Sequence, residues 1–556
     1  FRGLTYTVRT RAGPKEILRD VSGCAMGGRM LAIMGGSGAG KTTLLDVLSH
    51  RATLRGRFVL SGSVLLNGKP LTRQRFARCA AHVAQEPMLW STLTTRETLR
   101  YAAELFGSGM SAAEQEALVD RILAQTGMTS CQHTIVGDLF RKGLSGGQKK
   151  RLVIAEALAK QPAMLVLDEP TSSIDSSAAL ELTRVFHSIT QRSNLMVICT
   201  IHQPSHRIFE LFDDMLLLAG GRVAYGGQTQ GVMKYMLGLG APSPAEGQST
   251  AEYLLEQTNA DFADAQQLAH ILDAWKPEVA HVADDVALPE TGMRTSLRQL
   301  WILTRRLAII IRRDPTLYLG RWIFCFLGNA LFCLVYLDAR ERNQDQALPR
   351  IWLLSWDVGA VAFLSVVVIA VFHMELHIFQ KERQNNMYRN LPYLASKFIV
   401  TVPAVFMMSL FALAPVVAII GLRWEALPWI WVSHAVSTLW SECLAELLAV
   451  CMPHYLLGMA AYILIKFTAF LLGGVVVSTD SVTWAVRWLA YLNPWLYGLR
   501  SLTNFDFVGS TFEGFGEFGE LCRPPPSPCL GKDGSDVLDS LGVLRSSFGS
   551  EHDPWE

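Results

Sequence analysis

A glycine-rich segment near the start of the chain has the composition of a phosphate-binding loop. Its sequence is GGSGAGKTT, and it lies between the strand-like run MLAIM and the helix-like run LLDVLSH. In that context backbone N–H groups can surround phosphate oxygens, Lys41 can reach the β- and γ-phosphates, and Thr42 can offer its hydroxyl to Mg²⁺. An ordinary glycine turn is the alternative, and the flanking strand and helix count against it. We therefore predict a nucleotide site made by Gly35, Gly36, Ser37, Gly38, Ala39, Gly40, Lys41, Thr42 and Thr43.

A second group of residues could hydrolyse the bound nucleotide. The apolar run MLVL ends in two adjacent acids, of which Asp168 can hold Mg²⁺ and Glu169 can polarise the attacking water. His202, in TIHQP after another apolar run, can reach the γ-phosphate, and Gln85, in AHVAQEP, can bring its amide to Mg²⁺ and water. Alone, an acid pair at a strand end is usually a polar terminus, and a single His or Gln is more often a surface or core residue. Beside a phosphate loop, the set predicts a hydrolysis site.

The stretch LSGGQKKR provides a second place for an anion. Ser145, Gly146 and Gly147 expose N–H groups at the start of the helix-like run QKKRLVIAEALA, and a helix N-terminus favours negative charge. If this turn and the phosphate loop lie on separate lobes of one chain, the turn must bind the nucleotide held by another copy. The sequence therefore predicts a dimer in which Ser145, Gly146, Gly147 and Gln148 complete the partner's site.

The ordered motifs GGSGAGKTT, AQEP, LSGGQKKR, MLVLDEP, SSID and TIHQP together resemble the cassette of an ATP-binding cassette (ABC) transporter. One cassette before one membrane domain is similar to the G subfamily of half transporters, the white-brown complex group. Segments that match this subfamily include LSGSVLLNGK, LTTRETLRYAA, IHQPSHRIFELFD, FQKERQNNMYR and WAVRWLAYLNPWLYGLRSLTNFDF. The resemblance implies ATP and Mg²⁺ as cofactors. It also implies a homodimeric or heterodimeric exporter of lipids, sterols or other amphipathic compounds.

Other expectations rest on the same resemblance. Ile174 stands where the family usually has Leu, a difference that we expect to be harmless. Tyr6 and Val8 both fall near the place of the adenine-stacking aromatic residue, and only Tyr6 could stack. Three phenylalanines match positions that face the central cavity in multidrug members, and lipid-facing or packing roles are the alternative. We expect the substrate cavity at Phe363, Phe467 and Phe470.

Composition divides the chain into a cassette and a membrane part. Half of the 556 residues are hydrophobic and 18% are charged, so two or more domains are expected, one of them in lipid. A net charge of +1 gives no reason to expect a nucleic-acid partner, because no excess positive field exists to attract phosphates. The expected fold is an α/β P-loop ABC nucleotide-binding domain followed by an all-α polytopic transmembrane domain. The expected segments are a nucleotide-binding domain at 1–240, a linker at 241–292, an amphipathic connecting helix at 293–315, transmembrane helices at 316–478 and a re-entrant or extracellular loop region at 479–556.

Five apolar stretches are each near the ~20 residues that a bilayer requires. They cover about 316–337, 354–373, 397–422, 427–452 and 455–477. The cassette must stay with ATP in the cytosol, which fixes the orientation of this integral multi-pass protein, and we expect it in the plasma membrane. The family has six spans, so we expect the natural protein to continue past Glu556 with about 20 apolar residues and a short basic tail.

Ionisable residues inside the spans need partners, because charges in a bilayer are costly. Glu442 and Glu446 share a helix face and Lys466 lies near the middle of the next span, so we expect these three to pair inside the bundle. This arrangement favours a structural ion pair over a substrate site.

Two further pairs of residues lie at the ends of the spans or outside them. Glu382 and Arg383, at the cytosolic end of the second span, are candidates for transmitting cassette closure to the helices. Cys522 and Cys529 bracket RPPPSP in a segment expected outside, so a short disulfide loop is predicted there. The other cysteines are expected to behave as small hydrophobic residues.

Three functional classes compete for this sequence. An ATP-driven exporter accounts for the cassette, the spans and their order. An importer would need a substrate-binding partner, which nothing in the sequence indicates. A partner subunit of an obligate heterodimer, with a mainly regulatory or structural role, would be expected to show a degraded motif. A soluble ABC ATPase or a P-loop kinase is excluded by the spans, so the exporter is the favoured interpretation.

Overall fold

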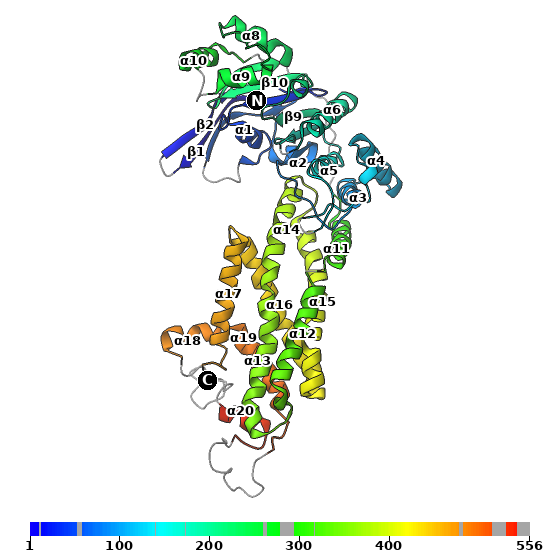
Figure 1. The fold of residues 1–556 in the computed structure, drawn as a ribbon, viewed down its shortest axis with the longest axis vertical. Helices are drawn as coiled ribbons and strands as arrows, with labels where there is room; N and C mark the ends of the chain where they lie inside the picture. Colours follow the sequence, from blue (N-terminus) through cyan, green and yellow to red (C-terminus); the bar gives the residue numbers. More distant parts are fainter. Residues whose placement is uncertain are drawn as a thin grey trace. The chain divides into compact units, whose positions relative to one another are not determined.

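The computed structural model describes residues 1–10, 13–52, 58–138, 141–172, 174–259, 264–277, 294–315, 317–477, 482–513 and 530–541. They form two compact units, coloured along the chain in Figure 1. The first unit consists of Phe1–Leu303 and Gln380–Tyr393, and the second of Thr304–Phe379 and Leu394–Glu556. A short segment between two helices of the second unit therefore belongs to the first.

A six-stranded sheet with the order β11-β10-β3-β9-β8-β7 forms the centre of the first unit. The strands are β3 (Met30–Gly35), β7 (Ala80–Val83), β8 (Met164–Leu167), β9 (Met196–Thr200), β10 (Asp214–Ala219) and β11 (Arg222–Gln228). All neighbours from β10 to β7 are parallel, and β11 is antiparallel to β10. Every residue of β3 and β8 is buried, as expected of parallel strands covered on both faces.

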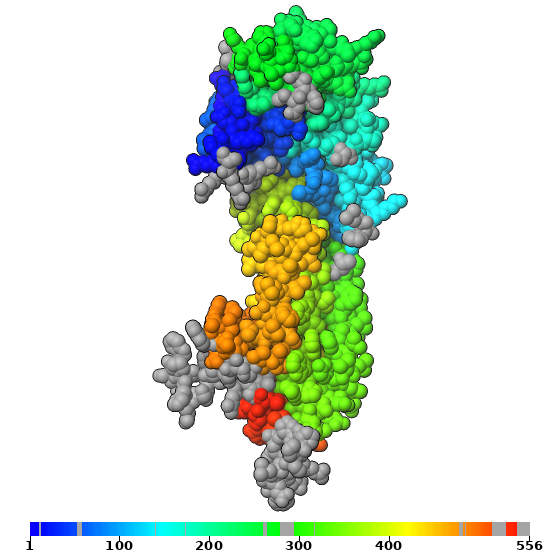
Figure 2. Space-filling view, turned by 60° about the vertical axis from the view of Figure 1, so that its left-hand side comes forward, coloured from blue at the N-terminus to red at the C-terminus, as the bar shows by residue number. Residues whose placement is uncertain are grey.

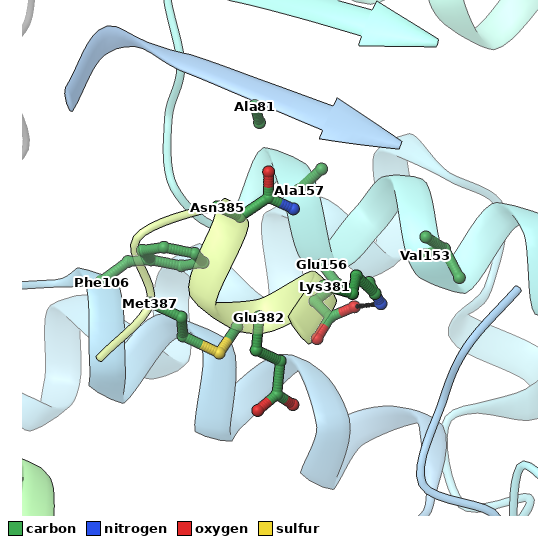
Figure 3. A pocket seen from close by; sticks show the side chains of 9 residues that line it. All are labelled: Ala81, Phe106, Val153, Glu156, Ala157, Lys381, Glu382, Asn385 and Met387. Carbon is green, nitrogen blue, oxygen red and sulfur yellow. Dashed lines mark hydrogen bonds and ion pairs between the residues drawn. The ribbon is translucent and has the colours of Figure 1, made fainter. Parts of the chain in front are cut away.

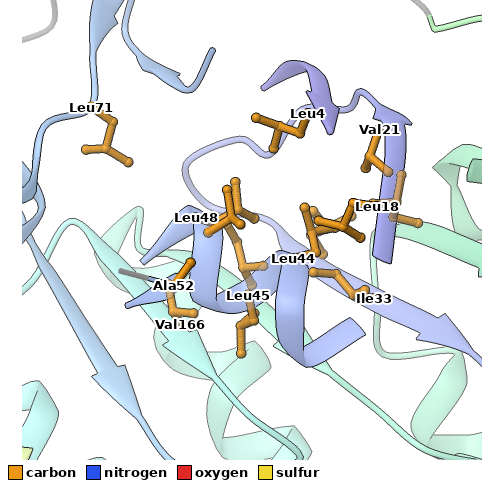
Figure 4. Close-up of a cluster of buried hydrophobic side chains, with 14 of the residues drawn as sticks. Leu4, Leu18, Val21, Ile33, Leu44, Leu45, Leu48, Ala52, Leu71 and Val166 are labelled. Atoms are coloured by element: carbon orange, nitrogen blue, oxygen red, sulfur yellow. The ribbon is translucent and has the colours of Figure 1, made fainter. Parts of the chain in front are cut away.

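Smaller antiparallel sheets pack beside this one. One has the order β2-β1-β4, and the other pairs β5 with β6. Their strands are β1 (Arg2–Thr10), β2 (Gly13–Val21), β4 (Phe58–Ser63), β5 (Leu65–Leu66) and β6 (Lys69–Pro70). Leu4 and Leu18 from these sheets share one apolar core with Ile33 of the central sheet and Leu44 of the helix after β3 (Figure 4). Leu66 belongs to the same core. This core holds the phosphate-loop helix against both sheets.

Several helices of the first unit begin with side-chain caps that the sequence supplies. Thr94 with Glu97, Ser111 with Glu114 and Ser145 with Gln148 form reciprocal capping boxes. The α-helices are α1 (Lys41–Leu48), α2 (Arg73–Cys79), α3 (Thr95–Phe106), α4 (Ala112–Gln125), α5 (Gly146–Leu158), α6 (Ser176–Ser193), α7 (His206–Phe209), α8 (Val232–Gly238), α9 (Thr250–Thr258) and α10 (Ala265–Ala274), and α11 (Ser296–Arg313) begins in this unit and continues into the second. Helix α11 falls within the stretch 293–315 predicted as the connecting helix.

The second unit is helical in its described residues. Its elements are α12 (Leu319–Val335), α13 (Ala347–Leu364), α14 (Val366–Gln384), α15 (Asn390–Pro415), α16 (Leu427–Cys451), α17 (Tyr455–Leu471), α18 (Trp484–Tyr491), α19 (Pro494–Phe507) and α20 (Gly534–Leu541). A π-helical turn, Val416–Ile420, extends α15. Each of the five predicted spans falls on one or more of these helices, and α12, α13 and α16 run side by side in Figure 1.

Apolar side chains cover much of the surface of the second unit. On α12, Phe324, Leu331 and Val335 are 66%, 62% and 69% exposed, and on α17 Leu464 is 67% exposed. Part of this surface, on α16 and α17, is drawn in yellow to orange in Figure 2. Among the described residues, two helical segments are long and apolar enough to cross a membrane, Gln344–Gln384 and Asn390–Ile420. Such a surface is stable in hydrocarbon and costly in water.

The prediction that Glu442 and Glu446 pair with Lys466 is wrong, because each of these residues has a different partner. Glu442 pairs with Arg321, both buried, and Glu446 lies 3.3 Å from Lys397. Lys466 instead donates to the Ser441 hydroxyl at 2.7 Å and lies over the Trp440 ring. Each charge therefore has a partner inside the unit, as its cost in lipid requires.

A second buried polar cluster joins four helices of this unit. Asn329 of α12 donates to Asp357 of α13 at 2.5 Å. The second carboxylate oxygen of Asp357 lies 3.5 Å from His434 Nε2 of α16, and His434 Nδ1 shares a 2.7 Å hydrogen bond with Ser409 of α15. All four side chains are at most 1% exposed. Cys522 and Cys529, for which the sequence predicts a disulfide, lie outside the described residues.

Candidate functional site

The glycine-rich loop leaves the carboxyl end of β3 and leads directly into α1. Its Lys41 is 7% exposed and donates from Nζ to the carbonyl oxygens of Gly35 and Gly36, both at 2.9 Å. Burial lowers the pKa of Lys41, and the negative charges of Glu169 and Asp168 partly offset that effect. The ammonium is therefore held over the loop beside the two acids.

Gly35 shows why this loop needs glycine. A Cβ atom at this position would lie 2.3 Å from the carbonyl oxygen of Leu218 on β10. Gly38 and Gly40 have positive φ angles of 76° and 100°, which side chains disfavour. The loop can therefore turn closely over the sheet with its N–H groups available. Ser37, Ala39, Thr42 and Thr43 complete the segment between β3 and the first turn of α1.

Four of the predicted motifs meet at one edge of the sheet. The glycine loop follows β3, and His202 follows the neighbouring parallel strand β9. The acids Asp168 and Glu169 follow the next strand, β8, and Gln85 follows β7. Because the carboxyl ends of parallel strands lie at the same edge, residues far apart in sequence come together there. Gln85 Nε2 donates to Glu169 Oε2 at 2.8 Å. His202 is exposed, two residues past the end of β9.

Thr200 links the two acids, and sequence reasoning missed it. Its hydroxyl accepts from the Glu169 N–H at 2.8 Å and donates to Asp168 Oδ1 at 2.7 Å. Glu169 has a φ of 44°, a left-handed conformation that its surroundings must stabilise. The only sequence signal was a polar residue at the end of an otherwise apolar strand.

The LSGGQ turn forms the start of α5. Ser145 is the N-cap: its hydroxyl accepts from the Gln148 N–H at 3.3 Å, and its own N–H donates to Gln148 Oε1 at 2.9 Å. Ser145 and Gly146 are exposed, and open space surrounds Gly146. The Gly146 and Gly147 N–H groups belong to the first turn of the helix, where partial positive charge gathers.

A buried lysine on α5 connects this helix to the turn after the acids, and no sequence pattern indicates this contact. Lys150 Nζ donates to the carbonyl oxygen of Ser172 and, at 3.0 Å, to the Ser172 hydroxyl. That hydroxyl donates in turn to the Glu169 carbonyl oxygen at 2.9 Å. Burial lowers the pKa of Lys150, and the charge of Glu169 partly offsets this. The LSGGQ helix and the acids are thus joined within one chain.

Tyr6 lies inside the core in the structure. It is 3% exposed, and its ring stacks on Phe58 with centroids 5.3 Å apart. Adenine stacking on Tyr6 would therefore require this ring to be uncovered.

Family models of known proteins match the first and the second part of the chain separately. A family model described as ABC transporter matches residues 18–172, and two described as ABC-2 type transporter match 298–507 and 202–255. Protein white of Drosophila melanogaster is 30% identical over 585 residues, which cover 98% of this chain and 82% of that protein. The chain belongs to the G family of ABC transporters.

Other similar proteins are also members of the ABC transporter G family. ABC transporter G family member 12 of Dictyostelium discoideum is 28% identical, with 96% of this chain and 85% of that protein covered. G family member 4 of the same organism is 25% identical, with 96% of this chain and 67% of that protein covered. The chain therefore spans about two thirds of the length of some relatives and more than four fifths of others. It is an ATP-hydrolysing membrane transporter, with an N-terminal ABC ATPase domain and a helical ABC-2 membrane domain, as the sequence predicts.

The structure brings together two of the three phenylalanines expected at the cavity of this transporter. Phe363 of α13 and Phe470 of α17 both lie against Trp495 of α19, with ring centroids 6.1 Å and 5.6 Å apart. Phe470 also contacts Trp356 at 5.5 Å. Phe467 is 52% exposed and is not part of these ring contacts. The aromatic group thus joins three helices of the membrane unit.

Proposed function

We propose that this transporter works as a dimer of half transporters and exports lipids, sterols or other amphipathic compounds. The observation that carries the catalytic part is the contact between Gln85 and Glu169 at the sheet edge that also holds Asp168 and the glycine loop. Hydrolysis needs a base and a metal site beside the γ-phosphate, and these residue types provide both.

The proposed nucleotide site assigns a role to each group. Residues 35–43 surround the phosphates, and Lys41 compensates their charge. The Thr42 hydroxyl, the Asp168 carboxylate and the Gln85 amide oxygen are hard oxygen donors of the kind that Mg²⁺ prefers, so the donor set fits this ion. Bound Mg²⁺ would neutralise charge on the phosphate oxygens.

Glu169 is the proposed general base. As water attacks the γ-phosphorus, the carboxylate accepts one of its protons, and the bond from phosphorus to the bridging oxygen of ADP breaks. Gln85, which donates to this carboxylate at 2.8 Å, fixes its orientation. The exposed His202 is proposed to contact the γ-phosphate.

The dimer follows from the exposed LSGGQ turn. Ser145 and the Gly146 and Gly147 N–H groups offer an anion site at the start of α5, and we assign it to the nucleotide held by Lys41 of a second half transporter, identical or related. Gln148 supports the turn through its capping contact with Ser145. All motifs needed for turnover are present, which supports an active subunit over a regulatory one.

The substrate class follows from the membrane unit. Its aromatic group of Phe363, Phe470, Trp356 and Trp495 suits apolar or amphipathic molecules, which such surfaces select by shape. We further propose the plasma membrane as its location, with the cassette in the cytosol; imaging of the tagged protein in its own cells tests this.

Substitution of Glu169 tests the catalytic assignment. Glu169→Gln removes the proton acceptor and keeps the shape of the side chain, so ATP binding should persist while turnover in nanodiscs is lost. The control is Glu210→Gln, at an exposed glutamate after α7, which should hydrolyse ATP normally. Near wild-type hydrolysis by Glu169→Gln would refute the assignment.

A further inference from the structure

An aspartate and a histidine face each other in the interior of the membrane unit. Asp357 Oδ2 on α13 lies 3.5 Å from His434 Nε2 on α16, which is too far for a normal hydrogen bond. Neither atom has a hydrogen-bond partner among the described residues, although both side chains are at most 1% exposed. Buried polar atoms are nearly always hydrogen-bonded, because leaving them unsatisfied is costly. A proton between these two atoms would satisfy both.

The basic partner of Asp357 differs from that of the other buried carboxylates in this unit. Three carboxylates are buried among its described residues, and the other two pair with arginine: Glu442 with Arg321 and Asp506 with Arg350. In the first unit, the buried carboxylate of Glu156 pairs with Lys381, as the dashed line in Figure 3 shows. Arginine and lysine ordinarily keep their charge near neutral pH, whereas histidine can gain or lose its charge there. Of the three, Asp357 is therefore the carboxylate without a permanent cation.

Uncharged groups surround the pair on the neighbouring helices. Asn329 of α12 donates to Asp357 Oδ1 at 2.5 Å, and the Ser409 hydroxyl of α15 lies 2.7 Å from His434 Nδ1. Two thiols and an indole complete these surroundings: Cys325 and Cys333 one turn before and after Asn329 on the buried side of α12, and Trp495 of α19 against Gly359 of α13.

The charged groups on the same helices lie further along them and have partners of their own. Arg350 is seven residues before Asp357 and Glu442 is eight residues after His434, or about 10–12 Å at 1.5 Å per residue. Both belong to the arginine–carboxylate pairs above. Lys466 of α17 donates to a serine hydroxyl of α16, seven residues after His434. An ionised Asp357 beside a neutral His434 would thus leave one negative charge uncompensated inside the bundle, which is costly in lipid.

We propose that Asp357 and His434 form a proton-binding site. The Asp357 carboxyl group holds the proton on Oδ2 and donates it to His434 Nε2, while the imidazole carries its own hydrogen on Nδ1 and donates it to the Ser409 hydroxyl. Asn329 donates to Asp357 Oδ1, as it does in the structure. In this form each contact joins a donor to an acceptor, and the cluster has no net charge. Release of the proton to water leaves a buried negative charge among α12, α13, α15 and α16 and weakens their packing.

The proton also affects the aromatic group that is proposed to bind substrate. Asp357 contacts α12 and α16, and Phe363 lies further along α13, against Trp495. Weaker packing around Asp357 displaces Phe363, so binding of an apolar compound should weaken as pH rises. This consequence rests on the substrate class proposed above, whereas the proton site itself does not.

The pH dependence of unfolding tests the site. In the unfolded chain an aspartate loses its proton at about pH 4, so at neutral pH the folded protein binds more protons than the unfolded one, and its stability falls as pH rises. Asp357→Asn imitates the protonated group, because its amide is uncharged and can donate to His434 Nε2. In denaturant titrations of the full chain in detergent, the unfolding constant of wild type relative to Asp357→Asn should rise by up to about tenfold per pH unit, until the folded site has released its proton.

Infrared spectroscopy provides a second readout that requires no unfolding. At neutral pH, wild type should show the C=O stretching band of a protonated carboxylic acid, and Asp357→Asn should lack it. The matched control is Asp338→Asn, at an exposed aspartate after α12, which should keep both the band and the wild-type pH dependence. If Asp357→Asn does not fold, His434→Gln replaces it: its amide oxygen still accepts from the carboxyl group, so the band should persist at a shifted frequency.

Two outcomes would overturn the inference. One is that the stabilities of wild type and Asp357→Asn change with pH in parallel. The other is that wild type has no carboxylic acid band at neutral pH, or that His434→Gln leaves this band unmoved. ATP hydrolysis and export enter neither measurement, so a failure of the proposed function and a failure of the proton site can be told apart.

Discussion

Thr200 offers the sharpest test of how the fold arranges the acids. Thr200→Val keeps the shape of a fully buried side chain and removes only the hydroxyl that connects Asp168 and Glu169. The Glu169 N–H loses its acceptor, at a cost of about 1–3 kcal/mol, and Asp168 loses a hydrogen bond to a charged group worth about 1.5–3 kcal/mol. Neighbouring contacts are not additive, so we expect the free energy of unfolding to fall by about 3 kcal/mol.

Two measurements can test the effect of Thr200→Val. At about 2 °C per kcal/mol for a large domain, the midpoint of thermal unfolding of the cassette should drop by about 6 °C. The rate should fall more than the stability suggests, because Glu169 would no longer be held in its left-handed conformation; we expect kcat to drop about tenfold to a hundredfold. KM for ATP should change little, since the glycine loop is untouched.

Matched substitutions separate this effect from a general loss of packing. Thr200→Ser retains the hydroxyl and should keep most of the activity. Thr183→Val alters another buried threonine, on α6, whose hydroxyl donates to Ala179 within its own helix at 2.8 Å, and it should leave kcat unchanged. A Thr200→Val protein with wild-type turnover and unfolding temperature would refute the reasoning.

Three further outcomes are expected. Cysteines placed beside Lys41 and Ser145 should cross-link between two chains, and cross-links found only within one chain would refute the dimer. Arg321→Met should leave the buried Glu442 carboxylate without its partner and cost about 3–5 kcal/mol, seen as a lower unfolding temperature in detergent, whereas Arg321→Met/Glu442→Leu should recover most of the loss. Burial lowers the pKa of Lys41, and bound phosphates would raise it, so ATP binding takes up a proton. ATP affinity should therefore fall as pH rises through the alkaline range in which Lys41 loses that proton before ATP binds; titration calorimetry checks this, and unchanged affinity would contradict it.

The nucleotide motifs could be predicted because each is a local pattern with a fixed role. The glycines, Lys41 and the paired acids occur beside the strand or helix that positions them, so neighbouring residues are enough to recognise them. Thr200 and Asp357 are different, because their partners become neighbours only when β9 lies beside β8 and when α13 packs against α12 and α16. An isolated Thr or Asp in the sequence does not show which residues it will contact.

Which charged residues pair between the membrane helices could not be predicted from the sequence either. Arg321 lies near the start of the first predicted span, where a basic residue is ordinary, yet it is 2% exposed and pairs with Glu442 across the bundle. The pairing expected from proximity in sequence, Glu442 with Lys466, depended on knowing which helices pack together. Hydropathy locates the helices and does not determine their neighbours or their rotation.

Buried polar contacts determine that rotation. Asp357 and Phe363 lie on α13 six residues apart, about 120° around the helix axis. The contacts of Asp357 with Asn329 and His434 hold one face of α13 toward α12 and α16, and this leaves Phe363 directed to Trp495. Because lipid provides no hydrophobic preference between helix faces, these polar contacts decide which aromatic residues gather inside the unit. The orientation of the proposed substrate surface therefore depends on a polar cluster made of other residues.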